Sequence, residues 1–355
     1  MSVSVANGIY PASESDRETN PGASLANYKI VHFGDVVYNS MRMWQGAVDA
    51  SRYDGIVSPA YVVARPNSEV YARFFARLLR QPMLLKQYQQ VSQGNSKDTQ
   101  VLKFDDFASI GISMPVSENE QRQIGGFFDR LDSLITLHQR KYDKLCVLKK
   151  SMLDKMFPKG GSLYPEIRFS GFTDPWEQRK LGELFEESDE RASDREILSV
   201  SVANGIYPAS ESDRETNPGA SLANYKIVHF GDVVYNSMRM WQGAVDASRY
   251  DGIVSPAYVV ARPNSEVYAR FFARLLRQPM LLKQYQQVSQ GNSKDTQVLK
   301  FDDFASIGIS MPVSENEQRQ IGGFFDRLDS LITLHQRKLE LLRNIKKSML
   351  DKMFV

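Results

Sequence analysis

The feature that most constrains this chain is a long internal repeat. Residues 2–141 recur without a single difference at residues 199–338, with an offset of 197 throughout. A shorter repeat follows, because KKSMLDKMF at 149–157 returns at 346–354. This period is far longer than the roughly 20 to 50 residues of solenoid repeats. The sequence therefore predicts a duplicated domain followed by a duplicated helix, arising from a recent duplication or from engineering.

The repeat is not symmetric, because the segment 158–198 occurs only once. Its first residues are rich in proline and glycine, which indicates a flexible connection. Copy one starts at Met1 without the counterpart of residues 164–198. We therefore expect its fold to be incomplete. Alternatively, the single 164–198 segment, or one from another molecule, fills the gap.

Each repeat ends in a segment with the periodicity of a long helix. Steps of four and three residues along 118–157 meet mostly apolar or aromatic side chains, a spacing of 3.5 residues that is typical of a coiled-coil seam. The seam positions are Ile124, Phe128, Leu131, Ile135, His138, Tyr142, Leu145, Lys149, Met152 and Met156. Those of copy two are Ile321, Phe325, Leu328, Ile332, His335, Leu339, Leu342, Lys346, Met349 and Met353. A helix of this length extends on the order of 60 Å, which favours a spacer over a helical hairpin that closes a core.

The seam offers no metal or redox chemistry. No cluster of Cys, His or carboxylate side chains completes a metal site around His138 or His335, so both are interpreted as packing residues. The single cysteine, Cys146, excludes an intramolecular disulfide and fits a reducing cytoplasm. We expect no metal site, a cytoplasmic protein and no secretory signal in the first residues.

The remainder of each repeat predicts a mixed α and β unit. Short runs rich in Val, Ile and Tyr, at 28–33, 35–40, 46–51 and 55–66, indicate strands separated by turns. Residues 69–91 indicate a helix broken near Pro82, and residues 108–115 a further short strand. With 42% hydrophobic residues, the chain can bury two ordinary cores, but it has no run long enough to cross a membrane.

Three polar stretches in each repeat are candidates for contact with nucleic acid. Arg and Gln can bond bidentately to guanine and adenine edges, and Lys can hold a phosphate. The candidates in copy one are Ser40, Arg42, Trp44, Gln45, Arg52, Tyr53, Gln93, Asn95, Lys97 and Thr99. Those in copy two are Ser237, Arg239, Trp241, Gln242, Arg249, Tyr250, Gln290, Asn292, Lys294 and Thr296.

These candidates have plainer interpretations. Polar loops are usually solvated, and Trp44 can equally belong to a core. Arg73, Arg77 and Arg80 recur at helical spacing, either as a solvated face or as a phosphate-contacting one. The net charge of +2 requires any DNA-binding cations to gather on one face.

Motifs for several kinds of catalysis are absent from the sequence. It contains no G-x-x-x-x-G-K-[ST] for ATP and no G-x-G-x-x-G for a cofactor. It also lacks an Asn/Asp-Pro-Pro-aromatic motif and a convincing set of nuclease carboxylates. We therefore expect no catalytic residues and a chain that is not an enzyme.

Two stretches resemble a known family. YPEIRFSGFTDPWEQRKLGEL (164–184) resembles the opening of a target-recognition domain in type I restriction–modification specificity subunits, and 92–123 resembles the end of one. The resemblance implies two recognition domains separated by two antiparallel conserved helices that form a coiled-coil spacer. The expected boundaries are 1–115 for the first, N-terminally truncated domain, 116–157 for spacer helix 1, 158–163 for a linker, 164–312 for the second domain and 313–355 for spacer helix 2.

The resemblance also implies a function. Such a subunit binds double-stranded DNA at a bipartite site and positions two modification subunits, which methylate adenine N6 with S-adenosylmethionine. Restriction subunits that use ATP and Mg²⁺ then join. These cofactors are expected on the partners and none in this chain.

This chain departs from the family pattern because its two recognition units are identical, which predicts an inverted-repeat target. The gap before copy one predicts a weakened or abolished first half-site contact. A coiled-coil scaffold without sequence-specific DNA binding and an enzyme with its own nuclease or methyltransferase activity remain as alternatives.

Overall fold

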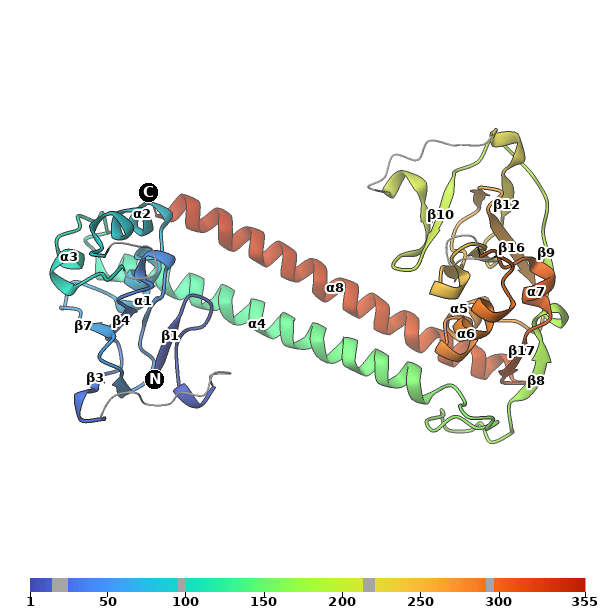
Figure 1. Ribbon diagram of the computed structural model, residues 1–355, viewed down its shortest axis with the longest axis horizontal. Coiled ribbons are helices and arrows are strands. Elements are labelled where there is room, and N and C mark those ends of the chain that lie inside the picture. Colours follow the sequence, from blue (N-terminus) through green and yellow to red (C-terminus); the bar gives the residue numbers. More distant parts are fainter. Residues whose placement is uncertain (15–24, 95–99, 213–220, 292–296, 355) are drawn as a thin grey trace. The chain divides into compact units, whose positions relative to one another are not determined.

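The computed structural model describes residues 1–14, 25–94, 100–212, 221–291 and 297–354, and it divides the chain into two compact units. Unit 1 comprises Met1–Arg140 and Gln336–Val355, and unit 2 comprises Lys141–His335. Two long helices, α4 (Glu118–Lys155) and α8 (Glu315–Met353), each pass from one unit into the other (Figure 1). Each unit therefore holds one repeat, the first part of its own helix and the last part of the other helix.

The two helices run antiparallel within unit 2. Lys149 of α4 lies 2.5 Å from Asp329 of α8. Eight residues further along, the ring of Phe157 lies 6.2 Å from that of Phe325. From Lys149 to Phe157 the residue number rises, while that of the contacted residue falls from Asp329 to Phe325. The two segments therefore run antiparallel.

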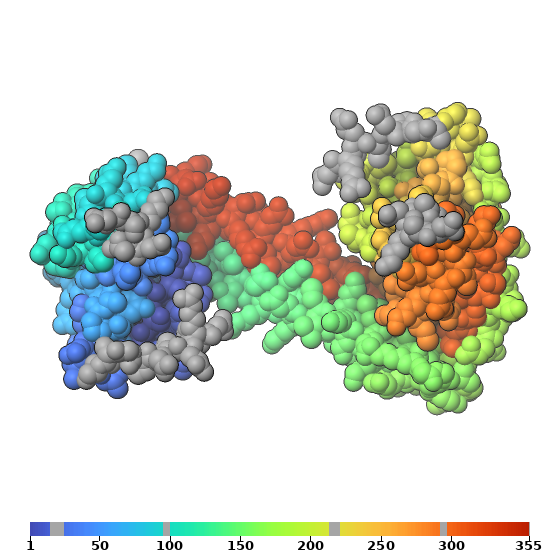
Figure 2. Space-filling view, in the orientation of Figure 1, coloured from blue at the N-terminus to red at the C-terminus, as the bar shows by residue number. Residues whose placement is uncertain are grey.

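Unit 1 repeats these contacts with the helices exchanged. Lys346 of α8 lies 2.6 Å from Asp132 of α4, and the Phe354 ring lies 5.9 Å from that of Phe128. The end of α8, red in Figure 2, meets the blue and cyan surface of the first repeat. Every predicted seam position is buried or half-buried except Met353, so the 3.5-residue spacing correctly identified the packing face.

The strands of the first repeat form small antiparallel sheets. Their bounds are β1 Ser2–Ser4, β2 Gly8–Tyr10, β3 Lys29–Val31, β4 Val36–Asn39, β5 Val48–Ala50, β6 Gly55–Val57 and β7 Tyr61–Ala64. β1 pairs with β2, β3 with β6, and β4 lies between β5 and β7. Three helices follow, namely α1 Ala72–Leu78, α2 Pro82–Val91 and α3 Phe104–Ala108. The predicted strands between residues 28 and 66 and the helix break at Pro82 are confirmed.

The second repeat has the same elements with additional strands. Its strands are β10 Leu198–Ser201, β11 Gly205–Pro208, β12 Lys226–Val228, β13 Val233–Asn236, β14 Val245–Ala247, β15 Gly252–Val254, β16 Tyr258–Pro263 and β17 Gly308–Met311. Its short helices are α5 Ala269–Leu275, α6 Pro279–Val288 and α7 Phe301–Ala305. The segment between the repeats adds β8 Glu177–Lys180 and β9 Phe185–Glu187.

One predicted strand forms in only one copy. β17 pairs with β8 in unit 2, but the identical residues 111–114 of unit 1 are not in a strand. A strand needs a partner for its backbone donors and acceptors. Among the described residues of unit 1, no segment takes the place of β8, so the prediction of a strand within 108–115 is wrong for copy one.

The start of each long helix packs closely on the domain that precedes it. A Cβ atom on Gly125 would lie 2.9 Å from the Tyr71 ring and 3.2 Å from the Phe74 backbone nitrogen. Gly322 has the same neighbourhood beside Tyr268. Glycine therefore lets the helix approach the domain without ending the helix. The predicted fold class, mixed α and β with two globular regions and two long antiparallel helices, is confirmed.

Candidate nucleic-acid interface

The first polar stretch of each repeat and the described ends of the third stretch lie together at one end of a β-hairpin. In copy one, residues 40–47 connect β4 to β5, and the Ser40 carbonyl accepts a hydrogen bond from the Leu102 backbone N–H at 2.8 Å. Leu102 follows the third stretch, whose Gln93 pairs with Val101 in an isolated bridge. Copy two has the same bond from Leu299 to Ser237 at 2.8 Å. The described ends of the third stretch therefore lie beside the first stretch, although the two are far apart in sequence.

In the first stretch, the Arg42 side chain is exposed and the Gln45 side chain is half-buried. Arg42 Nη1 donates to Gln45 Oε1 at 3.2 Å, and Arg239 donates to Gln242 at 3.2 Å in copy two. Arg42 and Arg239 are exposed and form no ion pair among the described residues. A guanidinium beside an amide, both on a short 3-10 turn, can meet a base edge or a phosphate.

Other predicted residues of the first stretch are engaged by the fold. The buried Ser40 hydroxyl donates to the Ala60 carbonyl at 2.7 Å, and Ser237 does the same to Ala257. The half-buried Trp44 packs against the core and its Nε1 donates to the Met41 carbonyl at 3.2 Å, as Trp241 does to Met238. These residues shape the turn that presents Arg42 and Gln45.

The second stretch lies at the opposite end of the hairpin. Val36 pairs with Ala50 in register, so Arg52 and Tyr53 follow β5 at the end remote from Arg42. Both side chains are exposed, as are Arg249 and Tyr250 in copy two. Arg52 lies 4.0 Å from Asp129 of α4, and Arg249 lies 3.3 Å from Asp326 of α8.

Only part of the third stretch is described. Gln93 Nε2 donates to Asp106 at 3.0 Å, and Gln290 donates to Asp303 at 3.0 Å. The remaining predicted residues of this stretch lie outside the described residues; they are Asn95, Lys97, Thr99, Asn292, Lys294 and Thr296.

The arginines of α1 join the domain to the long helix. Arg73 and Arg77 each donate to Asp129 at 2.7 Å, and Arg77 also lies 2.9 Å from Asp132. Burial acts to raise the pKa of Asp129, but these hydrogen bonds outweigh it and hold the pKa below its ordinary value. The Arg80 guanidinium donates to the Val48 carbonyl at 2.8 Å. Through these hydrogen bonds the three arginines stabilise the fold of the unit. They form neither a solvated face nor an open phosphate site.

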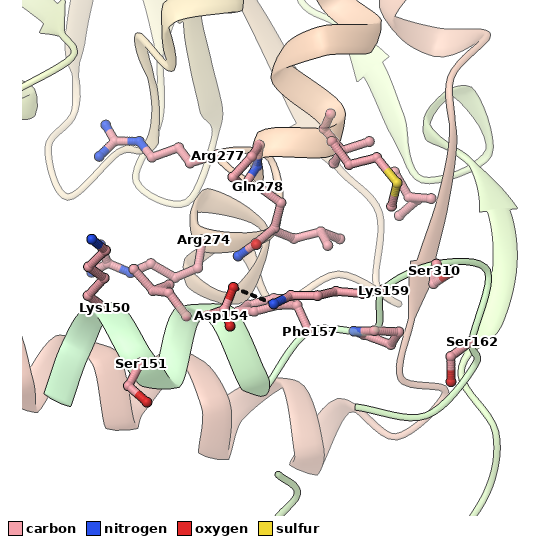
Figure 3. A pocket seen from close by; sticks show the side chains of 18 of the residues that line it. Lys150, Ser151, Asp154, Phe157, Lys159, Ser162, Arg274, Arg277, Gln278 and Ser310 are labelled. Carbon is pink, nitrogen blue, oxygen red and sulfur yellow. Dashed lines mark ion pairs between the residues drawn. The ribbon is translucent and has the colours of Figure 1, made fainter. Parts of the chain in front are cut away.

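A hollow recurs where the end of a long helix meets the domain. In unit 2 it encloses about 1160 Å³ between the end of α4, the turn from α5 to α6, and β17 (Figure 3). Some of its cations are paired, because Lys159 contacts Asp154 and Arg274 lies 2.7 Å from Asp329. The related hollow of unit 1, about 560 Å³, is lined by Arg77, Arg80 and the end of α8.

The packing of the single segment 164–198 was not predicted from the sequence. Trp176 is 1% exposed, and its ring lies 5.7 Å from Phe271 and 6.0 Å from Phe157. Arg168 forms two hydrogen bonds with the buried Glu317 carboxylate. The segment thus completes unit 2, and the alternative in which it covers copy one is wrong. The tryptophan within an otherwise polar run was the one available signal.

The same aspartate has different surroundings in the two units. In unit 1, Arg65 donates to both Asp35 oxygens, at 3.0 and 3.1 Å. Burial acts to raise the pKa of Asp35, but these bonds prevail and the pKa is lowered. In unit 2, Arg262 donates to Glu190 at 3.0 Å, and burial raises the pKa of Asp232. Arg262 also stays 3.5 Å from Asp232, so in copy two the arginine is shared between this aspartate and a residue of the single segment.

In the described part of the chain, no three His, Cys, Asp or Glu side chains are grouped as metal ligands. No helix in the same residues is long and apolar enough to span a bilayer.

Known proteins share this organisation. The sequence model of the family described as "Type I restriction modification DNA specificity domain" matches residues 7–146 and 173–344. The chain is similar to the HsdS subunit from Thermoanaerobacter tengcongensis, with 17% identity, 94% of this chain and 83% of that chain covered and a TM-score of 0.45. It is also similar to the S subunit of a type I restriction–modification system from M. genitalium, with 15% identity, 92% and 84% covered and a TM-score of 0.50, a likeness of fold.

The family match covers both repeats and the start of each long helix, and therefore most of the chain. Specificity domains of this kind select the DNA target, and catalysis belongs to other subunits of the system. The chain belongs to the family of type I restriction–modification DNA specificity domains, of which it carries two copies.

Proposed function

We propose that this specificity subunit binds a bipartite DNA site whose two halves form an inverted repeat around a spacer. One observation carries the proposal: both units are built from the same recognition residues, with the roles of two antiparallel helices exchanged. Identical recognition surfaces favour identical half-sites. Two identical reading units related by a two-fold axis would place those half-sites in inverted orientation.

The recognition surface that we propose in each unit is centred on the turn that carries Arg42 or Arg239. An exposed arginine beside a half-buried glutamine on one turn can donate to base edges in the major groove. The sequence of the third stretch also contains a lysine, outside the described residues, and lysine can hold a phosphate. Arg52 and Tyr53, at the far end of the hairpin, then contact the backbone or lie outside the footprint.

The chain's partners belong to the same proposal. Two modification subunits, which methylate adenine with S-adenosylmethionine, bind to it in the cytoplasm. Restriction subunits using ATP and Mg²⁺ join the complex. This chain itself binds none of these cofactors and contributes the choice of target.

The decisive experiment is methylation-site sequencing in cells that contain this chain and its modification subunit. We expect methylated adenines in two inverted half-sites at a fixed spacing. An asymmetric target, or methylation without a bipartite pattern, would overturn the inverted-repeat proposal.

Two assays with the purified chain separate the alternatives. DNA affinity should fall steeply with salt, because phosphate contacts release counterions; a scaffold would show no sequence-selective binding and little salt dependence. Incubation of the chain alone with DNA, Mg²⁺ and S-adenosylmethionine should give no turnover. Cleavage or methylation in this assay would favour an enzyme.

The first half-site is the weaker one in this proposal, because among the described residues of unit 1 no segment supplies the strands and apolar contacts that residues 164–198 give to unit 2. A footprint on an inverted-repeat DNA should show stronger protection over one half-site. Equal protection of both halves would refute this asymmetry.

A further inference from the structure

A hollow of unit 2 is lined by more positive than negative charge. It encloses about 1160 Å³ between the end of α4, the first turn of α6 and β17 (Figure 3). Its charged lining side chains are five cations and one acid, namely Lys149, Lys150, Lys159, Arg274, Arg277 and Asp154. A cleft lined mainly by one sign of charge attracts ligands of the opposite sign. The lining therefore favours an anion.

Three of these cations are already paired with carboxylates of the same unit. Lys149 lies 2.5 Å from Asp329, and Arg274 lies 2.7 Å from the same aspartate. Lys159 contacts Asp154, the one acid of the lining. Two cations of the lining remain, and these are the ones that attract a ligand most strongly.

The two remaining cations are Arg277 and Lys150. The Arg277 guanidinium donates through Nε to the Val245 carbonyl at 2.8 Å, but no carboxylate of the described residues pairs with it. Burial lowers its pKa, whereas Asp246 acts in the opposite direction from beyond ion-pair distance. Lys150 is exposed and also forms no ion pair within the described residues. A half-buried guanidinium without a counter-charge costs free energy, which a bound anion offsets.

Most of the remaining lining is apolar. Val147 and Met280 are 69% and 54% exposed, and Leu153 and Ile309 also line the hollow. Small-molecule sites enclose roughly 300–1,000 Å³ and combine apolar walls with a few polar groups. The hollow is therefore larger than an inorganic anion needs, and it fits an anion that carries an apolar or aromatic body.

The hollow is separate from the recognition turn and differs from its relative in unit 1. None of the described DNA-contact candidates of copy two lines it. The hollow of unit 1 is smaller, about 560 Å³, and four aspartates lie beside its cations, namely Asp49, Asp129, Asp132 and Asp351. Because this acidic lining opposes an anion, the inference concerns unit 2 alone.

We propose that the hollow of unit 2 binds a phosphate monoester with an apolar or aromatic body, of which a nucleoside monophosphate is one example. The phosphate group contacts Arg277 and Lys150, which lie at the same side of the hollow in Figure 3. A monoester carries about 1.5 to 2 negative charges near pH 7, which matches two cations, whereas each phosphodiester of DNA carries about one. Because a free ligand fills the site, the inference does not rest on the DNA target proposed above.

The single cysteine of the chain provides a readout confined to this hollow. Cys146 is half-buried, lines the hollow and lies one helical turn before Lys150. The test measures its alkylation by N-ethylmaleimide in the full chain by mass spectrometry, during a titration with adenosine monophosphate. At about ten times Kd the ligand should slow alkylation by up to about tenfold, because only the free protein reacts.

Three further additions identify the chemistry that is bound. Adenosine, which lacks the phosphate, and sodium chloride at matched ionic strength should each leave the alkylation rate within about twofold of the rate without ligand. A short non-cognate DNA duplex presents phosphodiesters in place of a monoester, and it should also leave the rate within about twofold.

Matched variants locate the site. Arg277→Gln and Lys150→Gln should each weaken the protection of Cys146 by at least about tenfold in ligand concentration, because each removes a charged donor to the phosphate. Arg80→Gln is the control, since Arg80 makes the same Nε bond to a carbonyl, that of Val48, in unit 1. It should leave the protection within about twofold.

Each outcome decides the proposal. Protection by adenosine monophosphate that Arg277→Gln and Lys150→Gln reduce and Arg80→Gln retains supports it. No protection, equal protection by adenosine or by salt, or equal effects of Arg277→Gln and Arg80→Gln overturns it. Protection by the duplex without protection by the nucleotide overturns the choice of a monoester. The inverted-repeat target is read from methylated sites and stands or falls separately.

Discussion

Arg168 donates two hydrogen bonds to the buried carboxylate of Glu317, at 2.7 and 2.8 Å, from a position 149 residues earlier in the chain. Trp176 Nε1 donates to the same carboxylate at 3.3 Å. The carboxylate therefore joins the single segment to the first turn of α8. The identical Glu120 of unit 1 is exposed, which makes the two acids a natural pair for comparison.

Glu317→Gln should destabilise the docking of the single segment by about 3 kcal/mol, because Arg168 then keeps a largely buried charge without its partner. Hydrogen exchange of a peptide within 164–187 measures this, since that sequence occurs once in the chain. Glu120→Gln should change stability by less than about 0.5 kcal/mol. Similar effects of both substitutions would contradict the different roles assigned to them.

The sequence was most informative where a repeating pattern fixes the geometry. The 3.5-residue spacing of Ile124, Phe128 and Leu131 identified the face of α4 that packs. Alternating Val and Tyr residues identified the strands. Periodicity does not show which chain segment supplies a neighbouring strand, however. The fate of Gly111–Met114 therefore depended on β8, which no local pattern in copy one reveals.

The candidate site was predictable only as a set of loops. The sequence identified residues 38–45 and 92–100 separately, but their proximity depends on the Leu102 to Ser40 hydrogen bond between distant segments. It also left open whether the α1 arginines face solvent. Their acidic partner, Asp129, lies on another element more than fifty residues away, beyond the range of helical spacing rules.

Phe157→Ala and Phe354→Ala form a second comparison between the units. Phe157 is buried among Trp176, Phe271 and Phe325, so its truncation should cost about 3–5 kcal/mol. Phe354 is half-buried against Phe74 and Phe128, so its truncation to alanine should reduce the free energy of unfolding by less.

The two helix ends carry unique sequences that separate these effects. Hydrogen exchange of 142–148 reports on unit 2, and exchange of 339–345 reports on unit 1. Each substitution should accelerate exchange mainly in its own unit. A larger loss from Phe354→Ala than from Phe157→Ala would contradict the difference in burial.

Stability should fall in acid partly through Asp129. Its folded pKa lies below the unfolded value of 3.8, so its stabilising contribution is present above that pH and is lost as the pH falls through the folded pKa. At pH 7, Asp129→Asn should cost about 1–2 kcal/mol, a range reduced because Arg73 is partly exposed.

Thermal unfolding of wild type and Asp129→Asn at several pH values tests this sign. The difference in stability should be constant near neutrality and shrink below about pH 4, as the wild-type carboxyl takes up a proton. A difference that grows in acid would show that the carboxylate is not stabilised by its arginines.

The exposed arginines of the β4–β5 and β13–β14 turns provide the test of DNA recognition. Arg239→Ala should weaken binding to the cognate DNA by about 1–3 kcal/mol if the side chain meets a base edge. If it meets a phosphate, the slope of affinity against salt should fall by about one. Fluorescence anisotropy on an inverted-repeat duplex at several salt concentrations distinguishes the two. Arg319→Ala, on a surface pair with Glu315, is the control and should change neither quantity.

Because Arg42 has the same neighbours as Arg239, the two substitutions also compare the half-sites. If unit 1 contacts DNA less strongly, Arg42→Ala should reduce affinity less than Arg239→Ala. Equal losses would show that the recognition turn acts independently of the segment 164–198. No loss from either substitution would remove the turn from the DNA interface.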